Sequence, residues 1–430
     1  MVQFILRKLL ILFSTILSVH VSANNLSIEN VQDEQSNIPI QQFANRFLNQ
    51  YKESDGFTAV SITAQCKGLN RFNPVTVYAG TIGRDDRRSI QDNSLWQIGS
   101  NTKSFTSIVL LQLEAEHPEF SIEDSLGKWF PEYSYWQDSQ HKVPTIHQLM
   151  NMTSGIPDDM TSKFIDWYAA NPYGYLLTKD MIDYAPKSLS YSPGSSWNYS
   201  NTNYQILSLL IGRITQKDYN GQDPAQVEIT NRIINKLRLH NTYYVTNLPT
   251  EYTTSSNLVN GYLSAGEPTE FSGFSLSYAA GSGNIISTTT DMNEYYHALY
   301  QPNKLLTPAQ FQKISSWVQD SGGQNPGQPI AEPSLAKNGD AYGLGIQAEQ
   351  VILSPERAKI YPNLAKHIGN YKFVYYYVGS TFGFNFYYLY NPKVNEYLVI
   401  GVNSRPVTQG NGDILDLVYD VLNYLDVTCN

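Results

Sequence analysis

The chain has 430 residues, of which 38 are acidic and 29 are Lys or Arg, so its formal net charge is −9 at pH 7. A chain with this charge is not expected to bind nucleic acid. Its scattered histidines and its two cysteines lack metal-ligand spacing, so we expect neither a metal ion nor another cofactor. The length suits one large domain with a sizeable core.

The first 23 residues have the pattern of a secretory signal peptide. Arg7 and Lys8 precede an apolar run at 9–19, and small residues follow at 21–23. The apolar run is too short to span a bilayer. No cysteine that could carry a lipid anchor follows the cleavage site. We therefore expect an exported protein, periplasmic or secreted, whose mature chain (24–430) is a single domain without a stable membrane anchor.

An amphipathic helix is predicted first, from apolar side chains at helical spacing: Ile40, Phe43, Phe47 and Tyr51. Strands rich in β-branched and aromatic residues are predicted near both ends of the chain, at 57–66, 75–79, 373–378, 384–390 and 396–403. A helix with an apolar face closes the chain at 414–425. These elements predict an α/β fold with one antiparallel sheet, built from both chain ends and flanked by helices.

Helices and long loops fill the middle of the chain, with clear helical periodicity at 204–214 and 233–239. We interpret about 100–300 as a helical lobe inserted into a sheet lobe formed by about 36–99 and 340–430. A Gly- and Pro-rich stretch at 321–329 predicts an exposed loop insertion at about 318–340. A functional site is expected in the cleft between the lobes.

The junction of the lobes carries the pattern of an activated serine. Ser100 opens an apolar helix, where free backbone N–H groups and the helix dipole can stabilise an oxyanion. Lys103 lies one turn later on the same face, so its amine can reach the Ser100 hydroxyl. This pair is the arrangement that a nucleophilic serine needs.

The Ser-x-x-Lys spacing is not unique in the chain. It recurs at Ser125 with Lys128 and at Ser334 with Lys337, both in polar or loop sequence, and we interpret these copies as chance matches. A Tyr-x-Asn pattern, which could supply a proton-transfer group, occurs at 199–201 and at 361–363. Because the chain has 32 tyrosines, neither copy is informative alone.

Three stretches together, around Ser100, at 146–157 and around Tyr199, closely resemble the serine β-lactamase and penicillin-binding protein superfamily. The resemblance is to the class C β-lactamase and DD-peptidase branch, which carries SxxK and YxN motifs. Segments 281–288 and 342–345 extend it over most of the mature chain. It implies a β-lactamase/transpeptidase-like fold.

The resemblance also implies roles for individual residues. Ser100 would be the acylated nucleophile, and Lys103 would keep it activated. Tyr199 would shuttle a proton to and from the leaving group. Asn201 would hold the substrate amide or the Lys103 ammonium.

The third family motif, Lys-Thr-Gly or His-x-Gly, is altered in this chain. Tyr377 stands where the cation should be, so the group expected to recognise a substrate carboxylate is missing. Tyr377 could also be a packed residue of an aromatic strand. Gly379 still allows close backbone approach, and the N–H of Ser380 could join that of Ser100 in an oxyanion hole.

Two residues at the end of the last predicted strand could replace the missing cation, at the place where the resemblance implies an asparagine beside the substrate carboxylate. We predict that Asn403 and Arg405 hold the substrate carboxylate; the alternative is an exposed arginine that closes a strand. The resemblance also implies that the first strands lie close to the terminal helix, so that Cys66 and Cys429 could form a disulfide. Two unpaired buried thiols are the alternative.

We therefore expect an exported serine hydrolase that works through an acyl-enzyme. The candidates are a D-Ala-D-Ala carboxypeptidase or similar peptidase, a β-lactamase-related enzyme and a carboxylic esterase, with efficient β-lactamase activity ranked last because of Tyr377. The chain has no GxSxG motif, which argues against an α/β-hydrolase. A non-catalytic binding or scaffold protein that retains the fold is the alternative from another class. The expected partner is a small molecule or peptide with an amide or ester carbonyl, and the expected state is a monomer.

Overall fold

The computed structural model describes residues 39–246, 257–264, 269–271, 273–333, 340–406 and 414–429. The expected signal peptide and the Ser-x-x-Lys copy at 334–337 lie outside these ranges. Within them, no helix combines the length and the apolar character that a membrane crossing requires.

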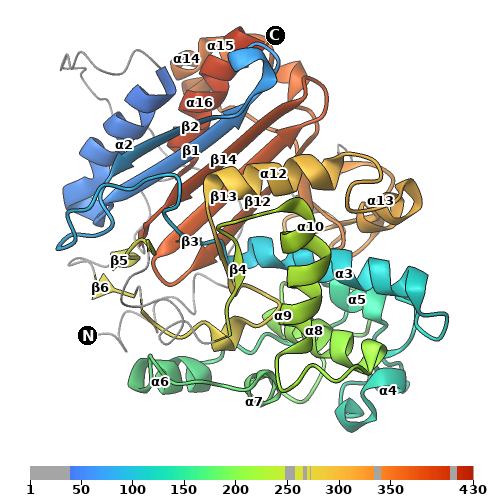
Figure 1. The fold of residues 1–430 in the computed structure, drawn as a ribbon. Coiled ribbons are helices and arrows are strands. Elements are labelled where there is room, and N and C mark those ends of the chain that lie inside the picture. The colour runs from blue at the N-terminus through green and yellow to red at the C-terminus, as the bar shows by residue number, and fades with distance from the viewer. Residues whose placement is uncertain are drawn as a thin grey trace.

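A nine-stranded sheet forms one layer of the molecule (Figure 1), in the order β2-β1-β14-β13-β12-β11-β10-β8-β9. Its long strands are β1 (Ala59–Gln65), β2 (Val75–Gly80), β12 (Val374–Thr381), β13 (Phe384–Asn391) and β14 (Glu396–Val402). β1 pairs antiparallel with β14, with Val60 opposite Val402 and Gln65 opposite Tyr397. The predicted antiparallel sheet built from both chain ends is thus confirmed.

The other four strands correct the predicted loop insertion at 318–340. They are short: β8 (Trp317–Gln319), β9 (Pro329–Ile330), β10 (Ala341–Tyr342) and β11 (Gln347–Glu349). β8 pairs with both β9 and β10 and so extends the sheet. The Gly- and Pro-rich stretch connects β8 to β9, and its last residue, Pro329, is the first residue of β9. The side chains of β8 are buried.

Two terminal helices, α2 (Pro39–Asp55) and α16 (Ile414–Cys429), cover one face of the sheet (Figure 1). Their apolar sides pack against the β1 side chains that point to this face, such as Val60 and Ile62. Cys66 and Cys429 form a disulfide across 363 residues, with a Cα–Cα distance of 5.8 Å. This cross-link agrees with the sequence prediction. Two short helices, α14 (Pro355–Ile360) and α15 (Pro362–Lys366), complete this layer.

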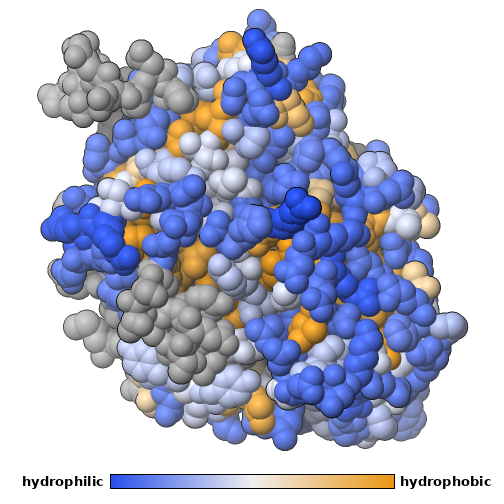
Figure 2. Space-filling model, viewed as in Figure 1, coloured by the Kyte–Doolittle hydropathy of each residue, from blue (hydrophilic) through white to orange (hydrophobic). Residues whose placement is uncertain are grey.

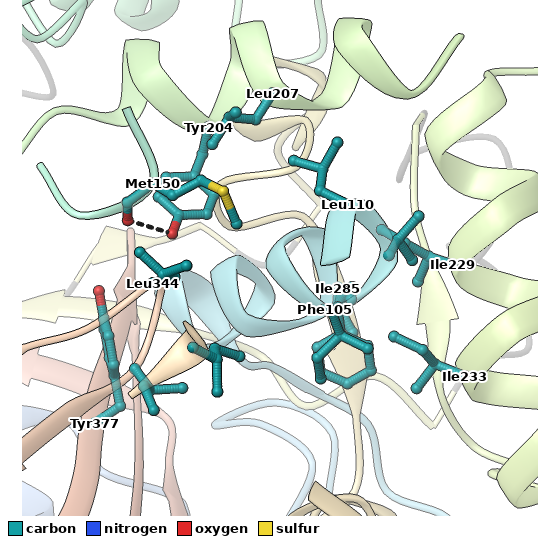
Figure 3. Close-up of a cluster of buried hydrophobic side chains, with 14 of the residues drawn as sticks. Phe105, Leu110, Met150, Tyr204, Leu207, Ile229, Ile233, Ile285, Leu344 and Tyr377 are labelled. Carbon is teal, nitrogen blue, oxygen red and sulfur yellow. Dashed lines mark hydrogen bonds between the residues drawn. The ribbon is translucent and has the colours of Figure 1, made fainter. Parts of the chain in front are cut away.

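The opposite face of the sheet packs against α12 (Thr289–Tyr300) and the helical lobe (Figure 1). At the centre of that lobe lies α3 (Thr102–Glu116), whose first ten residues, polar and apolar alike, are all buried. Figure 3 shows α3 side chains such as Phe105 and Leu110 enclosed by apolar residues from other elements. In this cluster the Tyr204 hydroxyl donates to the Met150 carbonyl at 2.8 Å.

Helices α8 (Asn201–Thr215), α9 (Pro224–Ile229) and α13 (Pro308–Ile314) pack against α3. The other described helices in this part of the chain are α4 (Leu126–Trp129), α5 (Ile146–Met150), α6 (Ser162–Ala170), α7 (Thr178–Ile182) and α10 (Asn235–Leu237). Helix α8 confirms the prediction at 204–214. The helix predicted at 233–239 is the end of a longer run, α9 to α10, with one π-helical segment at Thr230–Ile234.

Two small three-stranded sheets lie beside the main one. One contains β15 (Ser404–Pro406), β5 (Tyr262–Ser264) and β6 (Thr269–Glu270), and the other contains β3 (Trp96–Gln97), β7 (Ile285–Ser287) and β4 (Tyr243–Tyr244). Short 3-10 turns include η2 (Gly99–Asn101) and η5 (Ser277–Ala279). Figure 2 shows a mainly hydrophilic surface on this side of the molecule, with hydrophobic residues gathered toward its middle.

Candidate active site

Ser100 lies in η2, where the helical lobe meets strand β12. Two glycines make this contact close. A Cβ on Gly99, whose φ is +52°, would lie 2.6 Å from the Ser380 backbone nitrogen. A Cβ on Gly379 would lie 1.9 Å from the Ile98 carbonyl oxygen. Both positions therefore require glycine, and the contact brings the Ser380 N–H beside the turn that carries Ser100.

Lys103, on the first turn of α3, is fully buried and makes three hydrogen bonds. Its Nζ donates to the Ser100 Oγ at 3.1 Å, to the Asn201 Oδ1 at 2.9 Å and to the Ser282 carbonyl at 2.8 Å. None of these three acceptors carries a charge. Burial lowers the pKa of the Lys103 ammonium to about 7, although two nearby carboxyl groups oppose the shift. Near pH 7 this lysine is therefore poised between its charged and neutral forms.

Tyr199 stands on the other side of the serine. Its hydroxyl donates to the Ser100 Oγ at 2.6 Å, and the Lys103 Nζ lies 4.7 Å from the centre of its ring. Burial raises the pKa of the Tyr199 phenol far above neutrality, so this group is protonated at pH 7. The structure thus brings Ser100, Lys103, Tyr199 and Asn201 together, as the sequence suggested.

Tyr377 also belongs to this cluster. Its hydroxyl donates to that of Tyr199 at 3.3 Å and lies 3.2 Å from that of Tyr342. A continuous row of hydroxyls therefore leads from Ser100 through Tyr199 and Tyr377 to Tyr342. Burial raises the pKa of Tyr377 as well, so the position where the sequence motif led us to expect a cation holds a neutral phenol. Tyr377 is both a packed strand residue and a neighbour of the reacting groups.

Sequence reasoning missed two acidic residues. The backbone N–H of Asn201 donates to Asp158 Oδ1 at 2.9 Å, and Asp159 is buried directly beside it. It also missed the Ser282 carbonyl that accepts from Lys103. A signal was present for the acids, because they directly follow the 146–157 stretch that carries the family resemblance. The contact of Asp158 with Asn201, 43 residues away, depends on the tertiary fold.

Asn403 has a different role from the one that the sequence suggested. Its Oδ1 accepts from the backbone N–H groups of Thr58 and Ala59, at 3.0 and 2.9 Å. Its Nδ2 donates to the Thr58 Oγ1 at 2.6 Å and to the Asn260 carbonyl at 2.7 Å. The carboxamide is thus fully used in holding the start of β1, which corrects the prediction that Asn403 binds a substrate carboxylate.

Arg405 is not the exposed arginine of the alternative interpretation. It lies on β15, opposite Leu263 of β5, and its Nη1 is shielded from solvent. Burial lowers the pKa of the Arg405 guanidinium to about 10, while the nearby Tyr278 phenol opposes this shift. The group stays charged at neutral pH. Its proposed contact with a substrate remains a prediction.

Ser380 contributes more than a backbone N–H. Its hydroxyl donates to Asn385 Oδ1 at 2.5 Å, which fixes the side chain across the β12–β13 pair. Among the described residues, no group of three or more His, Cys, Asp or Glu side chains could hold a metal ion. The chemistry available here is that of a serine, a lysine and a phenol, with backbone N–H groups nearby.

Comparison with known proteins identifies the family of the chain and its structural neighbours. A family model described as Beta-lactamase matches residues 73–421. Protein flp of Staphylococcus aureus (strain COL) is 25% identical over 320 residues, which cover 74% of this chain and 55% of flp. The chain therefore spans about half the length of this curated relative.

Solved structures share the fold. A D-stereospecific amidohydrolase from Streptomyces sp. aligns with a TM-score of 0.66 and 22% identity, covering 88% of this chain and 96% of the other. The D-amino acid amidase from Ochrobactrum anthropi SV3, solved with L-phenylalanine amide, aligns with a TM-score of 0.67 and 17% identity, covering 91% and 99%. At these identities the likeness concerns the fold alone.

Proposed function

Because the chain belongs to the Beta-lactamase family, we propose that it is an exported serine hydrolase that cleaves an amide or peptide bond through an acyl-enzyme on Ser100. The observation that carries this proposal is the environment of the Ser100 Oγ, which lies 3.1 Å from the Lys103 Nζ and 2.6 Å from the Tyr199 hydroxyl. A nucleophile with a base and a proton carrier within reach is the requirement for acyl transfer.

The first half-reaction begins with Lys103 in its neutral form. Its Nζ takes the Ser100 proton while the Oγ attacks the substrate carbonyl carbon, and the resulting oxyanion accepts from the N–H groups of Ser100 and Ser380. The C–N bond then breaks. Tyr199 gives its hydroxyl proton to the leaving nitrogen and regains a proton from the Lys103 ammonium, so no phenolate accumulates.

Water completes the cycle by the reverse proton path. Lys103, neutral again, takes a proton from water through Tyr199 as the water oxygen attacks the acyl carbonyl carbon. The ester bond to Ser100 breaks, and the serine oxygen recovers its proton from the Lys103 ammonium. The raised pKa of Tyr199 supports a role in which the phenol passes a proton on without holding a charge.

The neutral phenol of Tyr377 supports a substrate preference. A carboxylate beside the scissile bond would meet no cation at this position, since Lys103 is committed to Ser100, Asn201 and Ser282. We therefore favour substrates that are neutral there, such as amino acid amides. The similarity in fold to a D-amino acid amidase and a D-stereospecific amidohydrolase supports D-configured ones. Short esters are the second candidate class, for the same reason.

A four-substrate panel tests this proposal. A D-amino acid amide, a peptide ending in D-Ala-D-Ala, a penicillin and a short aryl ester are assayed with wild type and with Arg405→Ala. We expect the amide and the ester to have higher kcat/KM than the penicillin. If Arg405 binds a carboxylate, its loss raises KM for the peptide and the penicillin, which both carry one, and leaves KM for the amide and the ester unchanged. An inert wild type that also forms no adduct with any probe would favour the binding-protein alternative.

A further inference from the structure

Two adjacent carboxyl groups, Asp158 and Asp159, lie behind the Lys103–Asn201 contact and take no part in the proton path described above. Asp159 is fully buried. Asp158 beside it is partly buried. Placing two carboxyl groups side by side with little access to water is costly unless they are paired or one of them is neutral. We therefore expect this pair of carboxyl groups to have a function in the site.

Asp158 determines which way the Asn201 carboxamide points. Asp158 Oδ1 accepts from the Asn201 backbone N–H at 2.9 Å, and Asp158 Oδ2 lies 3.5 Å from the Asn201 Nδ2. With its NH₂ group toward this carboxylate, the carboxamide must turn its Oδ1 toward Lys103, whose Nζ lies 2.9 Å away. The reversed carboxamide would place oxygen against carboxylate and NH₂ against ammonium. The negative charge of Asp158 thus acts on Lys103 both directly and through Asn201.

The hydrogen-bond partners of the two acids differ. Within the described part of the chain, its two carboxyl oxygens have no hydrogen-bond donor, and neither has the Gln205 Oε1. The Asp159 side chain faces those of Asp158 and Gln205, so a proton on Asp159 gives one of these acceptors a donor. Asp158, by contrast, accepts from the backbone N–H groups of Asn201 and Asp159. These donors place the negative charge on Asp158.

We propose that Asp158 is a positioning residue: it carries the single negative charge that it and Asp159 hold between them and, through Asn201, keeps Lys103 directed at Ser100. This inference rests on the proposed role of Ser100 and Lys103. The titratable groups that face Lys103 are the phenols of Tyr199 and Tyr204, whose rings lie beside its Nζ, and the two acids. The groups that face the two acids are Lys103, Asn201, Tyr199, Gln205 and Tyr278.

The test follows the rate at which a fluorophosphonate labels Ser100 as the pH is varied, because this readout needs no known substrate. The labelling rate of wild type rises with pH as Lys103 loses its proton. In Asp158→Asn the ammonium loses its negative neighbour, so its pKa falls and the rise in rate moves to lower pH by about 1 unit. Asp159→Asn and the exposed control Asp183→Asn keep the rise where wild type has it, and Asp158→Glu restores it.

A uniform loss of labelling at every pH in Asp158→Asn, with the rise in its wild-type place, would overturn the proposal. A shift caused by Asp159→Asn instead of Asp158→Asn would also overturn it. Should Asp158→Asn not fold, infrared spectroscopy of wild type provides a second test. A band from a protonated buried carboxyl group at neutral pH, absent in Asp159→Asn, is expected, and its absence from wild type contradicts the shared proton. A wild type that is never labelled at Ser100 refutes the proposed function, while the infrared band still tests the carboxyl pair.

Discussion

Two copies of the same Ser-x-x-Lys spacing lie in opposite environments. Lys103 is fully buried, and its Nζ donates to the Ser100 hydroxyl. Lys128, three residues after Ser125, has 47% of its side chain exposed and forms an ion pair with Asp124 at 2.7 Å. The first lysine has only neutral hydrogen-bond acceptors, and the second has a carboxylate and water. The Ser-x-x-Lys spacing alone therefore does not predict a nucleophile. Burial of the lysine is the feature that distinguishes the Ser100 copy from the Ser125 copy.

The two Tyr-x-Asn copies divide in the same way. Tyr199 donates to Ser100 in the junction between the lobes, whereas Tyr361 packs against Tyr419 on the far face of the sheet, with ring centres 5.5 Å apart. Among the described residues, each motif thus has one copy in the candidate site and one copy outside it. The second copies provide matched controls for mutations in the first.

The largest effect is expected from the serine. Ser100→Ala removes the nucleophile and should lower kcat/KM by roughly 10⁶-fold, as loss of a serine nucleophile does in other hydrolases. Ser125→Ala should leave kcat/KM unchanged. Steady-state kinetics on the best substrate of the panel measures both. Equal losses in the two variants would remove the distinction between the copies.

Loss of the phenol should cost less. Tyr199→Phe deletes the proton carrier and is expected to lower the rate by about 10²–10⁴-fold, the usual contribution of general acid–base catalysis. Tyr361→Phe should retain full activity. A drop of less than about threefold in Tyr199→Phe would mean that another group transfers the proton.

The pH dependence separates the two lysines. Since the pKa of Lys103 is lowered to about 7 and its neutral form is the base, kcat/KM should fall as pH decreases through about 7. Well below that pH, the fall should approach tenfold per unit. Lys128→Met should keep this profile, whereas Lys103→Met should lose both the activity and the pH-dependent rise. The range from pH 5 to pH 8 extends roughly one unit or more to either side of the lowered pKa. A wild-type kcat/KM that is flat over this range would contradict the assignment of Lys103 as base.

The smallest effect is expected at Tyr377. Tyr377→Phe removes a hydrogen bond to Tyr199 and should lower kcat about fivefold, which corresponds to ~1 kcal/mol. Tyr375→Phe, two residues earlier on the same face of β12, is the control and should have no effect on kcat. A loss in Tyr377→Phe as large as that in Tyr199→Phe would make Tyr377 part of the proton path.

Much of the fold follows from local sequence signals. The long strands are rich in β-branched and aromatic residues, and α8 and α16 have clear apolar faces, so the sheet built from both chain ends could be predicted. The strands β8 to β11 could not, because each has only two or three residues and exists through pairing with its neighbours. Periodicity gives no signal over so few residues.

The candidate site divides in the same manner. The contact of Ser100 with Lys103 follows from helical spacing, and Tyr199 and Asn201 follow from family resemblance. Asp158 could not be assigned, because its role depends on a contact with a distant segment. Asn403 was misassigned since its partners, Thr58 and Ala59, are about 345 residues away in sequence. A residue after a strand can cap a neighbouring strand as readily as it can bind a ligand.

The central claim is that Ser100 alone is the activated serine. Wild type, Ser100→Ala and Ser125→Ala are treated with a fluorophosphonate, and intact-protein mass spectrometry followed by peptide mapping locates any adduct. We predict one adduct per chain, on Ser100, in wild type and in Ser125→Ala, and none in Ser100→Ala. An adduct that persists in Ser100→Ala, or a wild type that remains unlabelled, would contradict the account.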